Sequence, residues 1–244
     1  MKGYYCIITL LLLAALLLCG CGGNGSATSS IFATKEPAAL TPEPTEAPTP
    51  EPTETLPAAD DIYGSFSGAR YENGVFGIGF EMNGWSFKTK EEIAELYDQA
   101  VSITTGELKE KLKNSTAVTI MYGESADSMD NVCVQVKDFD MQGYETDDEF
   151  TDRLLDEVIG PMNSMLEGSG IEDLSITKST VELFGKDTPC LAISGSYYGI
   201  LAVNIRQAYF FLGDYIMVIT ASSYVNDTRA ENVCRGFYLI DSHD

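Results

Sequence analysis

The chain has 244 residues, with 37 acidic and 15 basic side chains, a single histidine and a formal net charge of −22. A surface this acidic repels nucleic acid and anionic membrane, because it has no basic stripe to release counterions from phosphate. The single histidine, His243, excludes a histidine-based catalytic triad and a zinc site built on histidines. The sequence also contains no phosphate-binding glycine loop and no G-x-S-x-G elbow.

The first 20 residues read as an export signal that is followed by a cysteine. Lys2 supplies a positive start, residues 7–17 are rich in leucine, and residues 18–21 read LCGC. The apolar run is too short to span a membrane comfortably and is typical of a cleaved signal. A leucine three positions before Cys21 and a glycine directly before it resemble the lipobox of bacterial lipoproteins. The resemblance implies cleavage after residue 20 and a lipid on Cys21. The alternative is an ordinary cleaved signal that leaves Cys21 as a free thiol.

Residues 21–60 are expected to form the lipidated cysteine and a disordered tether. The run TPEPTEAPTPEPTETLP alternates Thr and Pro with Glu, and it cannot bury enough apolar surface to offset its ordering entropy. As a random coil the tether would span roughly 35 Å. Such spacers resemble the stalks that carry Gram-positive lipoproteins through the cell wall. The expected location is therefore the outer face of the cell membrane, with the lipid as the membrane contact.

Residues 61–244 have the periodicity of a single globular domain. A strand is predicted over 75–82, where Phe76, Ile78 and Phe80 share one face. Thr89 followed by Glu92 forms a capping box and predicts a helix start. A shorter helix is expected near 106–112, and strands are expected over 117–122 and 132–139.

The second half predicts a helix over 147–167, kinked or split at Gly160-Pro161. Four strands are then expected, with a tight hairpin at Gly213-Asp214 between the last two, and they cover 176–184, 189–194, 199–212 and 215–222. Thr228 and Glu231 form a second capping box. This capping box predicts a closing helix with Ala230, Val233, Cys234 and Phe237 on one face.

Strands joined by short turns predict an α+β domain, with a mainly antiparallel sheet and helices packed on it. The segment YENGVFGIGFEMNGW resembles the opening of PsbP/Mog1-like domains, in which a hairpin leads to an apolar strand, a Gly-Trp turn and a capped helix. The later strands and the closing helix are similar too. This chain has Met82-Asn83 where that family often has a proline. The resemblance implies a fold but no catalytic residue.

Three cysteines remain in the domain, so at most one disulfide forms. Cys133 and Cys190 lie in predicted strands and Cys234 lies in a predicted helix. Burial as small apolar side chains is the favoured interpretation. A Cys133–Cys190 disulfide is the alternative.

One acidic segment matches a calcium loop residue by residue. In DFDMQGYETDDE, Asp138, Asp140, Gln142 and Glu149 would supply side-chain oxygens at positions 1, 3, 5 and 12. Gln142 replaces the usual Asp or Asn, and a strand rather than a helix precedes the loop. The favoured interpretation is an acidic helix start without a bound ion, and no cofactor is expected.

These observations predict a membrane-anchored, extracytoplasmic binding or interaction module without enzymatic activity. Its partner would be a cell-wall component, a small ligand or a protein. The alternative function is a cell-envelope hydrolase that works through carboxylates alone. Aromatic residues gather near the last two hairpins and could line a ligand groove, although ordinary strand packing is the favoured interpretation; they are Tyr197, Tyr198, Tyr209, Phe210, Phe211 and Tyr215.

Overall fold

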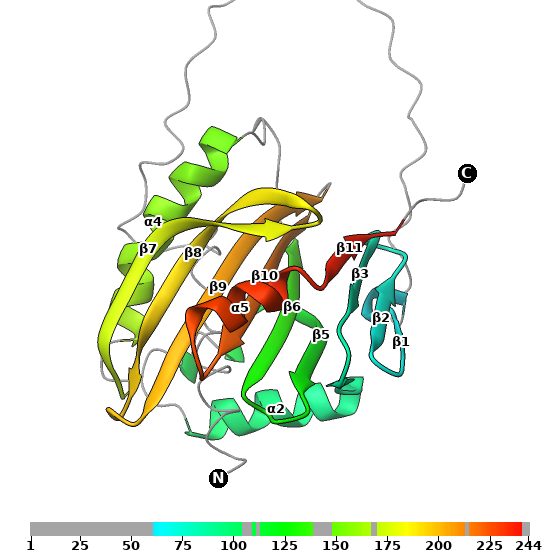
Figure 1. Cartoon of the computed structure of the whole chain (residues 1–244), viewed down its shortest axis with the longest axis horizontal. Helices are drawn as coiled ribbons and strands as arrows, with labels where there is room; N and C mark the ends of the chain where they lie inside the picture. The colour runs from blue at the N-terminus through cyan, green and yellow to red at the C-terminus, as the bar shows by residue number, and fades with distance from the viewer. Residues whose placement is uncertain are drawn as a thin grey trace, which may run out of the picture.

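The computed structural model describes residues 61–103, 109–110, 113–138, 148–166, 170–212 and 215–240. This part of the chain folds into two antiparallel sheets and three helices (Figure 1). The mixed composition and the antiparallel pairing confirm the predicted α+β class.

The smaller sheet has four short strands and combines the two ends of the described chain. A single 3-10 turn, η2 (Asp61–Tyr63), leads into it. Its strands, in spatial order, are β1 (Ser65–Ser67), β2 (Arg70–Asn73), β3 (Ile78–Glu81) and β11 (Phe237–Leu239). Gly79 of β3 lies under the ring of Tyr238, where a Cβ atom would be only 2.3 Å from the ring carbon. Only glycine allows β3 and β11 to pair this closely.

The larger sheet has seven strands. Their spatial order is β4 (Trp85–Phe87), β5 (Val118–Ser125), β6 (Asp130–Asp138), β10 (Tyr215–Ser223), β9 (Leu201–Leu212), β8 (Lys186–Tyr197) and β7 (Ile171–Leu183). In β5 the register shifts between Thr119 and Met121, which leaves Ile120 as the extra residue of a bulge. The three helices are α2 (Lys90–Ile103), α4 (Asp148–Leu166) and α5 (Asp227–Cys234).

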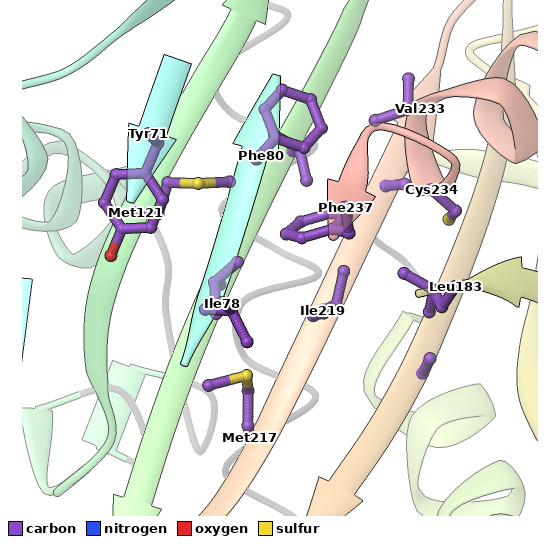
Figure 2. Packing of buried hydrophobic residues seen from close by; sticks show 14 of the residues in the cluster. Tyr71, Ile78, Phe80, Met121, Leu183, Met217, Ile219, Val233, Cys234 and Phe237 are labelled. Carbon is purple, nitrogen blue, oxygen red and sulfur yellow. The ribbon is translucent and has the colours of Figure 1, made fainter. Parts of the chain in front are cut away.

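The large sheet is covered on both faces. On one face, the small sheet and α5 bury an apolar cluster in which Phe80, Phe237 and Ile219 meet (Figure 2). On the other face, α4 covers the β7–β9 side and α2 covers β5 and β6. Alternation along each strand divides the side chains between these two layers.

The predicted start of α2 is confirmed in atomic detail. The backbone N–H of Thr89 donates to Oε2 of Glu92 at 2.8 Å, and the N–H of Glu92 donates to Oγ1 of Thr89 at 3.2 Å. Both capping-box bonds are therefore formed. The predicted strands from residue 117 onward also correspond to β5–β10; β7 and β8 are longer than predicted, and β9 begins two residues later than predicted.

The predicted bounds of the strand over 75–82 are wrong. Residues 75–77 belong to the turn before β3 rather than to the strand. The helix around Pro161 is one element, so it is not split there, and the kink at Gly160-Pro161 stays a prediction. The short helix expected near 106–112 lies largely outside the described residues, as do Gly213 and Asp214. The pairing of Leu212 with Tyr215 nevertheless has the register of a two-residue hairpin.

The second capping box is also wrong, because Glu231 has a tertiary partner. Asn226 caps α5 instead, and its side chain accepts the backbone N–H of Arg229. Oε1 of Glu231 accepts from Arg206, a buried side chain of β9, at 2.9 Å. The helix ends at Cys234, so Phe237 lies in β11.

All three cysteines are buried and free, as favoured by the sequence. Cys133 faces α2, whereas Cys190 points into the cluster on the opposite face of the sheet. Their strands β6 and β8 are separated by β10 and β9, which places them about 14 Å apart. The alternative Cys133–Cys190 disulfide is therefore excluded, since a disulfide needs Cα atoms within about 7 Å. Burial raises the pKa of the Cys133 thiol to about 12.

Candidate functional site

A cavity of about 170 Å³ opens where the small sheet meets the β4–β5 end of the large sheet. Four strands, the turn η2 and the first residues of α2 contribute to its walls. The lining residues are Tyr63, Gly64, Phe66, Tyr71, Phe87, Lys88, Thr89, Lys90, Ile93, Ile120, Met121 and Tyr122.

Aromatic rings dominate the walls. The ring of Phe87 in β4 lies 6.1 Å from that of Phe66 in β1 and 6.1 Å from that of Tyr71 in β2. Tyr71 and Met121 lie side by side in Figure 2, one from each sheet. Phe66 is 49% exposed and stands at the mouth, whereas Tyr71, Ile120 and Met121 are fully buried. The cavity thus has a closed apolar floor and an exposed aromatic rim.

One hydroxyl group on the floor holds the two sheets together. The phenol of Tyr71 donates to the carbonyl of Ile120 at 3.3 Å and accepts from Nδ2 of Asn73 at 2.9 Å. Burial raises the pKa of Tyr71 to about 12, and the bond from Asn73 opposes this rise only partly. Tyr71 is therefore a neutral, hydrogen-bonded part of the floor and not a general base.

The rim carries two of the chain's few lysines. Nζ of Lys88 lies 2.9 Å from Oε1 of Glu124, and Nζ of Lys90 lies 4.6 Å from the centre of the Tyr63 ring. Both lysines flank Thr89, where α2 begins. The position of Tyr63 depends on Gly64, which has a φ of 65°. A Cβ atom there would lie 2.5 Å from the carbonyl oxygen of Glu72.

This arrangement favours apolar binding over acid–base chemistry. Among the described residues that line the cavity there is no Asp, Glu, Asn, Gln or His. A hydrolase that works through paired carboxylates would need two acids beside its substrate, and this wall offers none. The rings provide the dispersion and stacking contacts that hold an apolar or aromatic group.

The residues of the predicted calcium loop are described only in part. Asp138 is the exposed last residue of β6, and Glu149 is the second residue of α4. Asp140, Gln142 and the lipidation candidate Cys21 lie outside the described residues. Within the ranges that the structure describes, no group of three or more His, Cys, Asp or Glu side chains could hold a metal ion. The calcium loop and the lipid on Cys21 remain predictions.

The aromatic residues singled out from the sequence do not line this cavity. Tyr209 is buried in the layer under α4, in agreement with ordinary strand packing. Tyr198, at the β8–β9 turn, is 61% exposed. The residues that do form the cavity were missed, although Phe66, Tyr71 and Phe87 alternate with polar neighbours along their strands. The alternation of apolar and polar residues shows which face of a strand is apolar, but it does not show which element packs against that face.

No family model matches the sequence, and no curated protein matches it. Among solved structures, the cyanobacterial PsbP (CyanoP) of Synechocystis sp. PCC 6803 is similar at 12% identity and a TM-score of 0.45, covering 72% of this chain and 98% of its own. A mutant of the protein Mog1 is similar at 11% identity and a TM-score of 0.36, covering 68% of this chain and 92% of its own. In the described part of the chain, no helix is long and apolar enough to cross a membrane.

Proposed function

We propose that this protein is a binding module held at the outer face of the cell membrane by a lipid on Cys21, and that it binds its ligand in the cavity between the two sheets. The observation that carries this proposal is the cavity itself. It has an aromatic wall and an exposed ring at its mouth, on a chain whose surface is otherwise strongly acidic. Exposed rings beside a preformed apolar hollow are typical of ligand sites.

The anchor and the tether support the same function. A lipid on Cys21 keeps the domain beside the membrane, and residues 22–60 let it search a shell of roughly 35 Å. A tethered module meets a cell-wall or membrane-proximal ligand at a high effective concentration, so a small site is sufficient.

The binding test is a thermal-shift screen of the full chain against peptides, glycans and metal ions. Saturable stabilisation is expected, and Phe66→Ala should reduce it by removing the ring at the mouth. Val75→Ala is the matched control, because Val75 is also an exposed apolar residue of the small-sheet region but lies outside the cavity. Turnover of a glycan, abolished by a single Asp or Glu change, would instead favour the carboxylate hydrolase.

The anchoring test is incorporation of labelled palmitate in a bacterial host. The wild type should be labelled, and Cys21→Ala should not. Cys19→Ala is the control, since the resemblance places the lipid on Cys21 alone, so this variant should keep its label. Persistent labelling of Cys21→Ala would contradict the lipid anchor on Cys21. It would not affect the proposal that the cavity binds a ligand.

A further inference from the structure

The size of the cavity limits its occupant to one small group. A dry protein cavity of about 150 Å³ holds a single benzene ring, whereas drug-sized ligands need about 300–1,000 Å³. At about 170 Å³, this cavity accommodates one aromatic ring or one leucine-sized side chain. A whole disaccharide or nucleotide would fit only in part.

The wall chemistry specifies an apolar group. Sugar hydroxyls are bound above all by carboxylates, which accept hydrogen bonds, and by carboxamides, which both donate and accept them. The described lining contains none of these groups in a chain that has 37 acidic residues. It also offers no carboxylate to neutralise a cationic ligand. The occupant therefore presents a ring or an aliphatic side chain to Phe66, Tyr71 and Phe87.

Among the described strands, β1 forms the outer edge of the small sheet and lies beside the mouth. β1 is the end strand of the small sheet, it pairs only with β2 among the described strands, and all three of its residues are exposed. An end strand offers unpaired N–H and C=O groups to an added strand. A residue placed directly opposite Phe66 on that strand would lie about 5 Å from it and on the same face. Because Phe66 lines the cavity, the side chain of that opposing residue would lie on the same side of the sheet as the cavity, beside the ring at its mouth.

We propose that the cavity recognises an extended peptide, which pairs with the outer edge of β1 and inserts one aromatic or leucine-sized side chain. This inference rests on the proposed function and names the ligand class for the same site. Strand pairing supplies sequence-independent affinity, and the cavity selects the peptide register through one side chain. The exposed mouth of the cavity and the edge of β1 then act as one binding surface.

The test uses the full chain purified in detergent and acetylated, amidated pentapeptides. The first is Thr-Thr-Phe-Thr-Thr and the second has alanine in place of phenylalanine. Binding is measured by calorimetry at millimolar concentration. The phenylalanine peptide should bind at least about tenfold more tightly, since burial of its ring supplies most of the specificity. Phe66→Ala should remove this difference, and Val75→Ala should retain it.

Backbone pairing is tested with two N-methylated versions of the phenylalanine peptide. Each version is methylated at alternate residues, and the residues methylated in one are those left unmethylated in the other. Only alternate N–H groups of an antiparallel strand face its neighbour, so one version should lose about tenfold in affinity and the other should not. Equal binding of both versions and of the unmethylated peptide would overturn the strand addition. Equal binding of the phenylalanine and alanine peptides would overturn the side-chain insertion.

A second ligand separates this inference from the proposed function. Methyl N-acetylglucosaminide is titrated under the same conditions. Sugar binding that Phe66→Ala abolishes, without peptide binding, would overturn the peptide inference and leave the cavity as a ligand site. Absence of saturable binding for every probe, in the wild type and in both variants, would overturn the proposed function and the peptide inference together.

Discussion

The hydroxyl of Tyr71 donates its hydrogen bond to the carbonyl of Ile120, the extra residue in the β5 bulge. A bulge removes its extra residue from the regular strand ladder. Tyr71 gives this carbonyl a partner from the other sheet, and Asn73 in turn donates to the phenol. One buried side chain thus joins the two sheets and forms the floor of the cavity.

Tyr71→Phe should destabilise the protein by about 1–2 kcal/mol. The buried carbonyl of Ile120 and the buried side-chain amide of Asn73 would both lose the Tyr71 hydroxyl as their hydrogen-bond partner. Urea unfolding of the full chain measures the change. Tyr238→Phe is a suitable control, since its hydroxyl group binds Arg70 at the surface. A loss no larger than that of the control would contradict the joining role of Tyr71.

The same phenol predicts a loss of stability at alkaline pH. Its pKa is raised from about 10 to about 12 in the folded state, so the unfolded state loses the proton first as pH rises. The contribution is complete below pH 10 and is lost as pH rises toward 12, on the order of 2 kcal/mol. Tyr71→Phe lacks this group, so its stability should fall less than that of the wild type over the same interval.

The sequence correctly predicted the features that depend on residues close together in the chain. The Thr89–Glu92 capping box involves residues three apart and forms as expected, whereas Glu231 satisfies the same local pattern but pairs with Arg206 on β9. Phe237 continued a helical periodicity, yet it pairs with Phe80 in a strand. Each miss comes from a partner distant in the sequence.

The cavity was unpredictable for the same reason. Phe66, Phe87 and Ile120 come from three strands in two sheets, and only the packing of those sheets brings them together. Nothing in the sequence alone specifies which edge of one sheet lies against which end of the other.

An acid-sensitive contact joins α5 to the β5–β6 turn. The carboxylate of Asp127 accepts from the hydroxyl of Ser125 at 2.7 Å, from Arg229 at 3.0 Å and from the N–H of Met129 at 3.1 Å. These bonds lower the pKa of Asp127 to about 2. Its contribution is therefore present above pH 4 and is lost as pH falls toward 2.

Asp127→Asn should reduce the free energy of unfolding at pH 7 by less than about 1 kcal/mol, because the side chain is half exposed. The variant should then lose less stability than the wild type between pH 4 and pH 2. Asp187→Asn, an exposed position in β8, is the control and should follow the wild-type pH profile. Identical profiles for all three proteins would show that Asp127 does not contribute.

Tyr198→Asn should stabilise the protein. Tyr198 and Gly199 occupy the corner of the β8–β9 hairpin with φ values of 49° and 64°, and the N–H of Ile200 donates to the carbonyl of Tyr197. Asn-Gly is the preferred pair for such a corner, whereas a bulky aromatic residue is strained there. We expect a gain of about 0.5–1 kcal/mol by urea unfolding.

Tyr198→Phe keeps the backbone strain, so its stability should change little. A loss in Tyr198→Asn would mean that the edge-to-face contact between the rings of Tyr198 and Tyr197 outweighs the backbone strain.

Calcium and magnesium should stabilise the protein equally. The favoured interpretation of residues 138–149 is an acidic helix start, and screening of the −22 charge is available to either ion. Melting temperatures at matched ionic strength, for the wild type and Glu149→Gln, measure this. A calcium-specific rise that Glu149→Gln abolishes would instead establish the predicted loop, because a site present only in the folded state adds about 1.4 kcal/mol at tenfold excess of ion.

A chain that begins at residue 61 should fold as stably as one that begins at residue 22. The composition changes at residue 60, and near the start of the domain the carbonyl of Ile62 accepts from Nδ2 of Asn73 at 2.7 Å. Asn73 is fully buried, and its Oδ1 also accepts from the N–H groups of Val75 and Phe76. Removal of residues 61–63 would expose Asn73 and delete Tyr63 from the cavity. We therefore expect a chain that begins at residue 64 to lose about 1–3 kcal/mol, whereas the one that begins at residue 61 loses nothing measurable.

Cooperative melting followed by circular dichroism compares the chains that begin at residues 22, 61 and 64. A marked loss on removing residues 22–60 would show that the tether packs on the domain and is part of its fold.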